Sequence, residues 1–203
     1  MTLYEELSEY LHKPVTPEQC KAASFGLVWE WANKESVLDY YRHSHLYVYD
    51  LTFYQTMLRS IGFKEWYESF FEQIHPKTGL DLGGGIGEYT IIAEKHGCKM
   101  DFVDVDGETL KYARWRFQKY GVSPVIHTED FKIDKDYDFI IAMDVLEHIE
   151  EPEPRIKEFA EHTEWLFANP GEVQYNDLYP QHISRYDLTP YFYNVQDYLW
   201  RRK

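Results

Sequence analysis

Cysteine is nearly absent from this chain of 203 residues, which contains only Cys20 and Cys98. The two lie far apart in the sequence and form no CxxC pair. This scarcity excludes a disulfide framework and a zinc site made of thiolates, and it is typical of a reducing compartment.

Long apolar runs are absent as well. No segment approaches the ~20 consecutive apolar residues that cross a bilayer. The N-terminus, MTLYEELSEYLHK, is acidic and lacks the apolar centre of a signal peptide. We therefore expect a soluble, cytoplasmic protein that does not contact a membrane.

Basic residues are few relative to acidic ones. Lys and Arg number 21 against 35 Asp and Glu, which gives a net charge of −14. Proteins that bind the phosphate backbone of a nucleic acid carry a basic surface, because Lys and Arg displace the counterions of the phosphates. The charge therefore argues against nucleic acid as a partner, and the sequence leaves the oligomeric state open.

Aromatic residues are abundant, with 18 Tyr, 12 Phe and 6 Trp. So much ring surface is incompatible with a disordered chain, which lacks the apolar area to offset its ordering entropy. A chain of this length can bury roughly 70% of its unfolded surface without disulfides or metals. We expect one folded core with an appendage.

Two regions differ in their pattern. Residues 1–75 are expected to form a helical N-terminal extension or lid, with helix starts at Thr16-Pro17 and at Ser36. Residues 76–203 are expected to form the core, in which strands alternate with helices from Gly79 onward. Such alternation predicts an α/β fold, Rossmann-like, with a mostly parallel sheet and helices on both faces. The expected strands are 79–82, 99–104, 125–127, 137–143 and 165–168, and the expected helices are 88–96, 107–120 with Asp106 as cap, and 152–163.

Ligands of such sheets bind beyond the carboxyl ends of the strands. The first strand ends in Asp81, followed by Leu82-Gly83-Gly84-Gly85-Ile86-Gly87. A dinucleotide loop, G-x-G-x-x-G/A, would need a small residue where Glu88 or Thr90 stands, and a G-x-x-x-x-G-K-[ST] loop is missing. The spacing is instead acid-x-G-x-G-x-G.

This spacing resembles motif I of class I S-adenosylmethionine-dependent methyltransferases, and the similarity extends over about residues 79–170. It implies that an acid at the end of the second strand, Asp104, accepts hydrogen bonds from both ribose hydroxyls. It also implies an acid near the adenine, for which Asp130 is preferred over Glu129. The resemblance thus assigns S-adenosylmethionine binding to Asp81, Gly83, Gly84, Gly85, Gly87, Asp104, Val105, Asp130 and Asp144.

The fourth strand leads into Asp144, Glu147 and His148. In a helical turn that begins after Met143, these residues would share one face. We expect the acids to raise the pKa of His148, so that the three act as a catalytic base for an acceptor that loses a proton. The alternative is that His148 only fixes the loop.

The run acid-x-x-Glu-His, followed downstream by His182, also resembles the metal site of small-RNA 3′-end 2′-O-methyltransferases. It implies a Mg²⁺ or Mn²⁺ site made of Asp144, Glu147, His148 and His182. A similar run occurs in quinone-precursor O-methyltransferases, so its first part alone does not imply RNA. His182 in a plain surface loop is the alternative.

Two further segments bear on the acceptor. Residues 39–54 hold Tyr40, Tyr47 and Tyr54 at intervals of seven, which predicts a helical stripe in the core or an aromatic wall of the pocket. Only 35 residues follow Ala168, so the C-terminal end is expected to be shortened, with one edge strand over 191–200. Asn169-Pro170 is expected to contact the acceptor or to form a plain turn.

The sequence therefore predicts an S-adenosylmethionine-dependent methyltransferase that acts on an O or N atom of a small molecule. Between residues 129 and 153, ten acidic residues outnumber two lysines, which favours a cation, a metal or a neutral polar molecule over a phosphate-rich acceptor. The alternatives are methylation of a protein side chain or an RNA end, and a non-catalytic cofactor-binding subunit that activates a partner.

Overall fold

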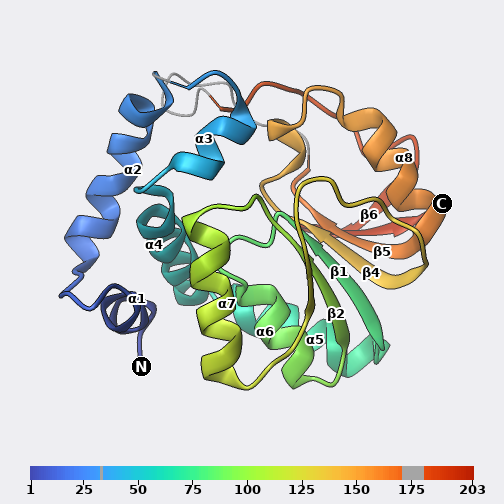
Figure 1. Ribbon diagram of the computed structural model, residues 1–203. Coiled ribbons are helices and arrows are strands. Elements are labelled where there is room, and N and C mark those ends of the chain that lie inside the picture. The colour runs from blue at the N-terminus through green and yellow to red at the C-terminus, as the bar shows by residue number, and fades with distance from the viewer. Residues whose placement is uncertain (33, 171–180) are drawn as a thin grey trace.

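The computed structural model describes residues 1–32, 34–170 and 181–203. Within them a seven-stranded sheet has the order β3-β2-β1-β4-β5-β7-β6 (Figure 1). The pairs among the first five strands are parallel, and β7 is antiparallel to both β5 and β6. The strands are β1 (Thr78–Leu82), β2 (Lys99–Val103), β3 (Val125–His127), β4 (Tyr137–Ala142), β5 (Thr163–Ala168), β6 (Phe192–Gln196) and β7 (Leu199–Arg202).

Helices cover both faces of the sheet, as predicted. On one face Phe70 and Phe71 of α5 pack with Ile92 of α6 against buried strand residues. On the other face Ile156 and Phe159 of α8 pack against the sheet and the C-terminal strands. The described helices are α1 (Leu3–Leu11), α2 (Pro17–Trp31), α3 (Val37–His43), α4 (Tyr47–Ser60), α5 (Phe63–Ile74), α6 (Glu88–Lys95), α7 (Glu108–Tyr120), α8 (Pro152–His162) and the short 3₁₀ turn η1 (Leu146–His148).

Capping residues start and stop these helices mostly where the sequence predicts. Thr16 and Gln19 form a capping box at α2, and the Ser36 hydroxyl accepts the N–H of Asp39 at α3. The predicted cap of α7 is wrong, because Gly107 precedes the helix and no side chain caps it. The exposed Asp106 instead uses its backbone N–H, which donates to Glu129 at 3.3 Å.

The C-terminal end differs from the expected single edge strand. β6 and β7 form a hairpin whose turn contains Asp197 at φ 45°. Trp200 of β7 lies opposite Leu166 of β5, and its indole N–H donates to the carbonyl of Ala168 at 3.0 Å. The exposed side chains of β6 lack the alternation that marks a half-buried strand, which explains why the sequence predicts one strand rather than two.

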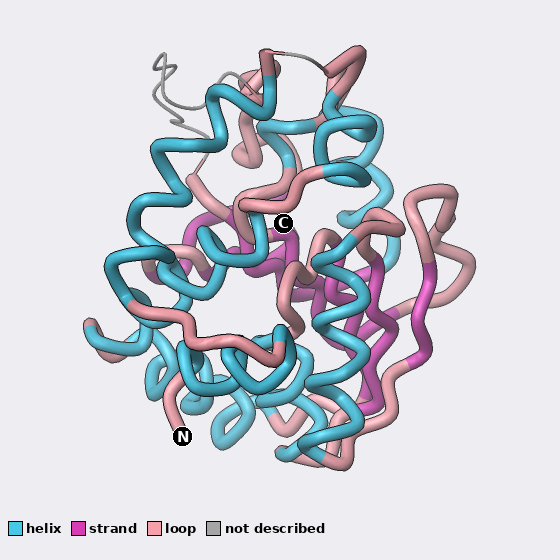
Figure 2. The backbone as a smooth tube through the Cα atoms, turned by 60° about the vertical axis from the view of Figure 1, so that its left-hand side comes forward, coloured by secondary structure: helices cyan, strands magenta, loops and turns pink. Residues whose placement is uncertain are grey.

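Helices α1, α2 and α4 share an apolar cluster with residues of the sheet core, and Figure 2 shows helices packed beside the strands. Leu3 and Leu7 of α1 and Val48 of α4 contact Ile86 and Tyr112 of the core. None of the described helices is long and apolar enough to cross a membrane. Whether residues 1–75 form a separate unit stays a prediction.

The tyrosines at intervals of seven do not share one helix face. Tyr40 belongs to α3, which ends at His43, whereas Tyr47 begins α4. Ser44 separates the two helices, because its hydroxyl accepts the backbone N–H of Tyr47 at 3.1 Å and thereby starts α4. The stripe expected from the spacing is therefore interrupted.

Candidate functional site

A cavity of about 290 Å³ opens at the carboxyl ends of β1, β2 and β4. The order of the strands reverses between β1 and β4, and ligands of open α/β sheets bind at such a switch point. The cavity is lined by Val37, Leu38, Tyr41, Tyr47, Leu82, Gly83, Gly85, Val103, Asp104, Val105, Glu129, Asp144, Val145, His148, Ile149 and Arg155.

The glycine loop follows β1 and forms the floor of this cavity. Gly83 and Gly85 line it with φ angles of 66° and 57°, in the left-handed region that glycine occupies without strain. A Cβ atom on Gly83 would lie 2.4 Å from the side chain of Val145. Gly84 and Gly87 pack inward, where a Cβ would meet Phe102 and Phe117, so they shape the loop without lining the cavity.

Asp81 lies beneath the loop and does not line the cavity. Its carboxylate accepts a hydrogen bond from the hydroxyl of Thr90 at 2.7 Å. Burial raises the pKa of Asp81 to about 7, although the bonds from Thr90 oppose this change. In this structure Asp81 joins the end of β1 to helix α6.

Asp104 and Val105 line the cavity at the end of β2, as predicted. The Asp104 carboxylate accepts the backbone N–H groups of Gly85 at 2.6 Å and of Val105 at 2.7 Å. Burial raises the pKa of Asp104 to about 7 despite these two bonds. A carboxylate has about four lone-pair sites, so Asp104 can still accept two hydroxyl groups.

Glu129 rather than Asp130 reaches the cavity wall. Asp130 is exposed and is not among the lining residues. Glu129 lines the cavity and forms an ion pair with Arg42 of α3, which ties the lid helix to the loop after β3. The role of Asp130 at the adenine stays a prediction, and the structure does not bring this residue to the predicted place.

Asp144 lines the cavity but does not share a helix face with Glu147 and His148, so the expected face is wrong. Its φ angle is 54°, which turns the chain before the short η1 begins. Its backbone N–H donates to Asn169 Oδ1 at 2.9 Å, and Asn169 Nδ2 donates to Asp144 Oδ1 at 2.6 Å. Asn169 thus contacts Asp144, and its contact with the acceptor stays a prediction.

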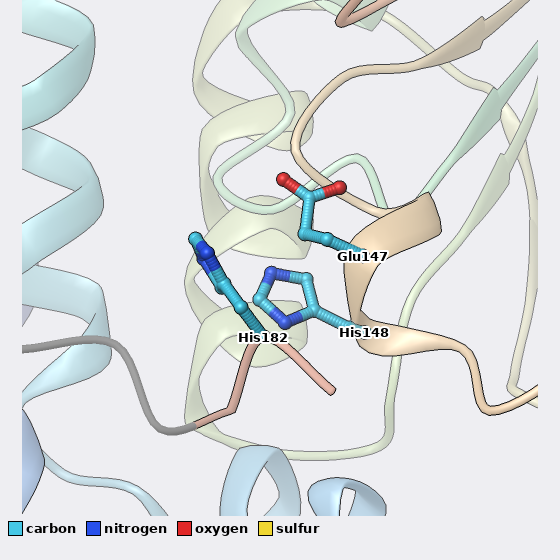
Figure 3. Close-up of side chains that lie close together, drawn as sticks. All are labelled: Glu147, His148 and His182. Carbon is cyan, nitrogen blue, oxygen red and sulfur yellow. The ribbon is translucent and has the colours of Figure 1, made fainter. Parts of the chain in front are cut away.

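Glu147, His148 and His182 lie close together (Figure 3), and of the three only His148 lines the cavity. One possible ligand atom from each falls within 4.8 Å of the others. The backbone N–H groups of Ile183 and Ser184 donate to the carbonyl of Glu147 at 2.9 and 3.0 Å, which holds the segment of His182 against η1. Asp144 lies outside this group, so the structure brings together three of the four predicted metal ligands.

The expected rise of the His148 pKa is wrong. Burial lowers the pKa of His148 to about 4, the neighbouring His182 lowers it further, and the contact with the Gln181 carbonyl opposes this change. Burial also lowers the pKa of His182. Burial raises the pKa of Glu147 to about 7, and the charge of Asp144 raises it further. Both imidazoles are therefore neutral at pH 7.

Two tyrosines of the N-terminal segment cover the cavity. Tyr41 of α3 and Tyr47 of α4 line it, and their ring centroids lie 4.8 Å apart. The Tyr41 hydroxyl lies 3.2 Å from both ring nitrogens of His148. A Cβ atom on Gly107 would lie 2.7 Å from the Tyr41 carbonyl, so glycine there lets α3 lie directly on the core. Figure 1 shows α3 between α2 and the segment that leads into α8.

A family model described as a methyltransferase domain matches residues 63–181, more than half of the chain. The chain belongs to this methyltransferase family. The predicted family and enzyme class are thereby confirmed, and the match begins at the first residue of α5. No match was found among curated proteins.

Solved structures with the same fold support the predicted architecture of this methyltransferase domain. An O-methyltransferase family protein from Burkholderia thailandensis is 13% identical, with a TM-score of 0.60 over 92% of this chain and 72% of that one. A putative O-methyltransferase from Nostoc punctiforme is 15% identical, with a TM-score of 0.54 over 91% and 61%. The chain spans 53% of the length of a further match, an S-adenosylmethionine-dependent methyltransferase from Clostridium acetobutylicum.

The sequence does not single out some residues that the structure places at the site. Arg155 lines the cavity from the first turn of α8. Gln181 holds His148 through its backbone carbonyl, 3.0 Å from His148 Nδ1. The contact of the Gln181 carbonyl cannot be predicted from the sequence. Arg155 directly follows the proline-rich start of a predicted helix, and this position could identify it as a candidate site residue.

Proposed function

We propose that this chain is an S-adenosylmethionine-dependent methyltransferase that acts on an O or N atom of a small molecule. The observation that carries the proposal is that Gly83, Gly85, Asp104, Val105 and Tyr41 line the same cavity. The glycine loop allows close approach of a ligand to the backbone, and Asp104 has lone pairs for a ribose diol. The cofactor supplies the methyl group when it is bound.

A small acceptor is favoured because α3 and α4 cover part of the cavity. Arg42 pairs with Glu129 across its edge, and Tyr41 reaches His148. A macromolecular acceptor could enter only if these two contacts broke. The net charge of −14 also disfavours a phosphate-rich acceptor such as RNA. Largely apolar cavities with a few polar groups are typical of sites for small molecules.

Methyl transfer needs the acceptor held in line with the cofactor, and it needs a base only when the acceptor loses a proton. Without a bound metal ion, Glu147, which precedes the lining residue His148, is suited to that task, since a pKa of about 7 lies near the operating pH. His148, whose imidazole is neutral, and Asp144 both line the cavity and would orient the acceptor.

The test is a screen of metabolite extracts with the isolated chain and S-adenosylmethionine that carries a labelled methyl group. Incorporation of label into a low-mass product supports the proposal. Binding of the cofactor without turnover would support a non-catalytic subunit instead, and labelled protein or RNA would support a macromolecular acceptor. The cytoplasmic location stays a prediction.

We also propose that Glu147, His148 and His182 bind Mn²⁺ in preference to Mg²⁺. The residues fit such an ion, because Glu147 Oε2 is buried without a hydrogen-bond partner and both imidazoles are neutral, as metal ligation requires. Two nitrogen ligands favour a transition metal over Mg²⁺, which prefers oxygen.

If the metal is bound, calorimetry will show one Mn²⁺ per chain, and H182A will weaken its affinity at least about tenfold. Treatment with EDTA will lower the turnover, and Mn²⁺ will restore it. The exposed His12→Ala serves as the matched control. Turnover that is indifferent to EDTA, together with unchanged heats in H182A, would contradict the proposal.

A further inference from the structure

Apolar side chains line the cavity away from the strand ends. Val37 and Leu38 come from the start of α3, and Ile149 directly follows η1. Leu38 is 46% exposed although it lines a cavity, so apolar surface is left that a ligand can cover. The glycine loop and Asp104, which we assign to the cofactor, follow β1 and β2 instead. These three side chains therefore suit the apolar body of an acceptor.

Arg155 is the permanent cation of this lining. Among the described residues that line the cavity there is no other Lys or Arg, and the imidazole of His148 is neutral at pH 7. Arg155 lies near the start of α8, behind Pro152 and Pro154. The positive end of a helix dipole disfavours a cation there. The dipole therefore does not explain why an Arg stands at this position.

One carboxylate holds Arg155 in place. Its Nη1 donates to Glu158 Oε2 at 2.6 Å, one turn further along α8. The other oxygen of Glu158 accepts the backbone N–H of Ile133 at 3.3 Å, from the loop after β3. No second hydrogen bond of the Arg155 guanidinium occurs within the described part of the chain. Since a guanidinium has five N–H donors in a planar fork, Arg155 can still bind an anion through two parallel hydrogen bonds.

Most of the acidic residues between 129 and 153 lie away from the cavity. Of the ten, only Glu129 and Asp144 line it, and Glu129 pairs with Arg42. Seven of the others are exposed, where water and salt screen their charges. Bound S-adenosylmethionine adds a net positive charge, because it has a sulfonium and an ammonium against one carboxylate. The acidic region is therefore compatible with an acceptor that carries one negative charge.

We propose that the acceptor is a small molecule with an apolar body and one anionic group of the carboxylate type, and that Arg155 binds this group. Glu158 is the positioning residue, because it fixes the guanidinium at the start of α8. This inference rests on the proposed function, since it concerns the acceptor that shares the cavity with the cofactor.

The carboxylate of the cofactor is the other anion that a guanidinium in this cavity can bind. Arg155 belongs to α8, which packs on one face of the sheet. The glycine loop leads into α6, which packs on the other face. The adenine and the ribose are neutral, so neither requires a cation. The position of Arg155 therefore favours the acceptor over the cofactor.

Three probes with the same ring separate the possible charges of the acceptor: benzoate, neutral benzamide and the benzylammonium cation. Ligand-observed NMR on the full chain, saturated with S-adenosylhomocysteine, measures their affinities. The wild type is expected to bind benzoate at least about fivefold tighter than the other two probes. R155M keeps an apolar stem but removes the charge. It is expected to weaken benzoate about 5–10-fold and to leave benzamide within about twofold.

E158Q is expected to raise the affinity for benzoate about two- to fivefold. The Gln side chain still accepts a hydrogen bond from Arg155 but no longer neutralises its charge. A gain of affinity cannot result from misfolding, so this variant keeps the test valid if R155M unfolds. K157M removes the same charge from the exposed face of the same helix and is the matched control. Its affinities for all three probes should stay within about twofold.

Other outcomes would overturn the inference. Equal binding of benzoate to R155M and to the wild type would remove Arg155 from anion binding. A wild-type chain that binds benzylammonium as tightly as benzoate would exclude an anionic acceptor. R155M that weakens S-adenosylhomocysteine but not 5′-methylthioadenosine, which lacks the amino-acid arm, would assign the guanidinium to the cofactor. A wild-type chain that binds no S-adenosylhomocysteine would instead contradict the proposed function itself.

Discussion

Replacing Asp104 by alanine is expected to weaken S-adenosylmethionine at least about 100-fold. The carboxylate would accept both ribose hydroxyls, and two hydrogen bonds to a charged group are together worth about 3 kcal/mol or more. The same substitution leaves the N–H groups of Gly85 and Val105 without their acceptor, which loosens the glycine loop. Calorimetry with the cofactor measures the loss.

The same carboxylate makes the affinity depend on pH. Burial raises the pKa of Asp104 to about 7 in the unliganded protein, whereas the ribose hydroxyls bind its ionised form. Protons therefore compete with the cofactor, and the affinity is about tenfold weaker at pH 6 than at pH 8. The contribution of Asp104 to this dependence will vanish in D104A.

Asp106 offers a matched control for both measurements. Asp106 lies two residues after Asp104, is exposed, and does not line the cavity. D106A should retain the affinity within about twofold and keep the full pH dependence. Equal effects of D104A and D106A would contradict the assignment of the ribose to Asp104.

The fold and one half of the site follow from local patterns in the sequence. Apolar runs that alternate with helical periods predict parallel strands, and glycines and acids directly after a strand come together at one edge of the sheet. Asp104 and Gly83 were placed by this rule, and both line the cavity. The position of each strand end is enough to predict this placement, because all parallel strands present their carboxyl ends at the same edge of the sheet.

The other half of the site depends on burial and on contacts between distant segments. Burial lowers the pKa of His148, and His182, more than 30 residues away in the sequence, lowers it further, which no local pattern reveals. The left-handed Asp144 breaks the helical spacing from which one shared face was predicted. Burial of a charged group depends on tertiary contacts, so the neighbouring sequence does not predict it.

Arg116 is the strongest example of such a contact. Its side chain is fully buried, and its guanidinium donates to Glu6 of α1 at 2.9 Å and to Glu88 of α6 at 2.8 Å. A third bond runs to the carbonyl of Ile86 at 2.7 Å, inside the glycine loop. The N-terminal helix and the cofactor loop are thus held by one side chain.

R116M is expected to lower the free energy of unfolding by about 3–5 kcal/mol, because removing one partner leaves buried carboxylates without compensation. Burial opposes ionisation of Glu88, but Arg116 and Arg59 outweigh it and hold the pKa of Glu88 below its ordinary value. Without Arg116 the pKa of Glu88 will rise, so the folded variant will bind more protons and its loss of stability will grow as the pH increases.

Urea denaturation at pH 5 and pH 8 measures both effects, and R114M on the exposed face of the same helix is the matched control. R116M should also weaken S-adenosylmethionine through the loop carbonyl of Ile86, whereas R114M should change neither quantity. Similar stabilities of R116M and R114M would mean that the buried charges are solvated in the variant. In that case α1 would be dispensable for the loop, and its removal should leave cofactor binding intact.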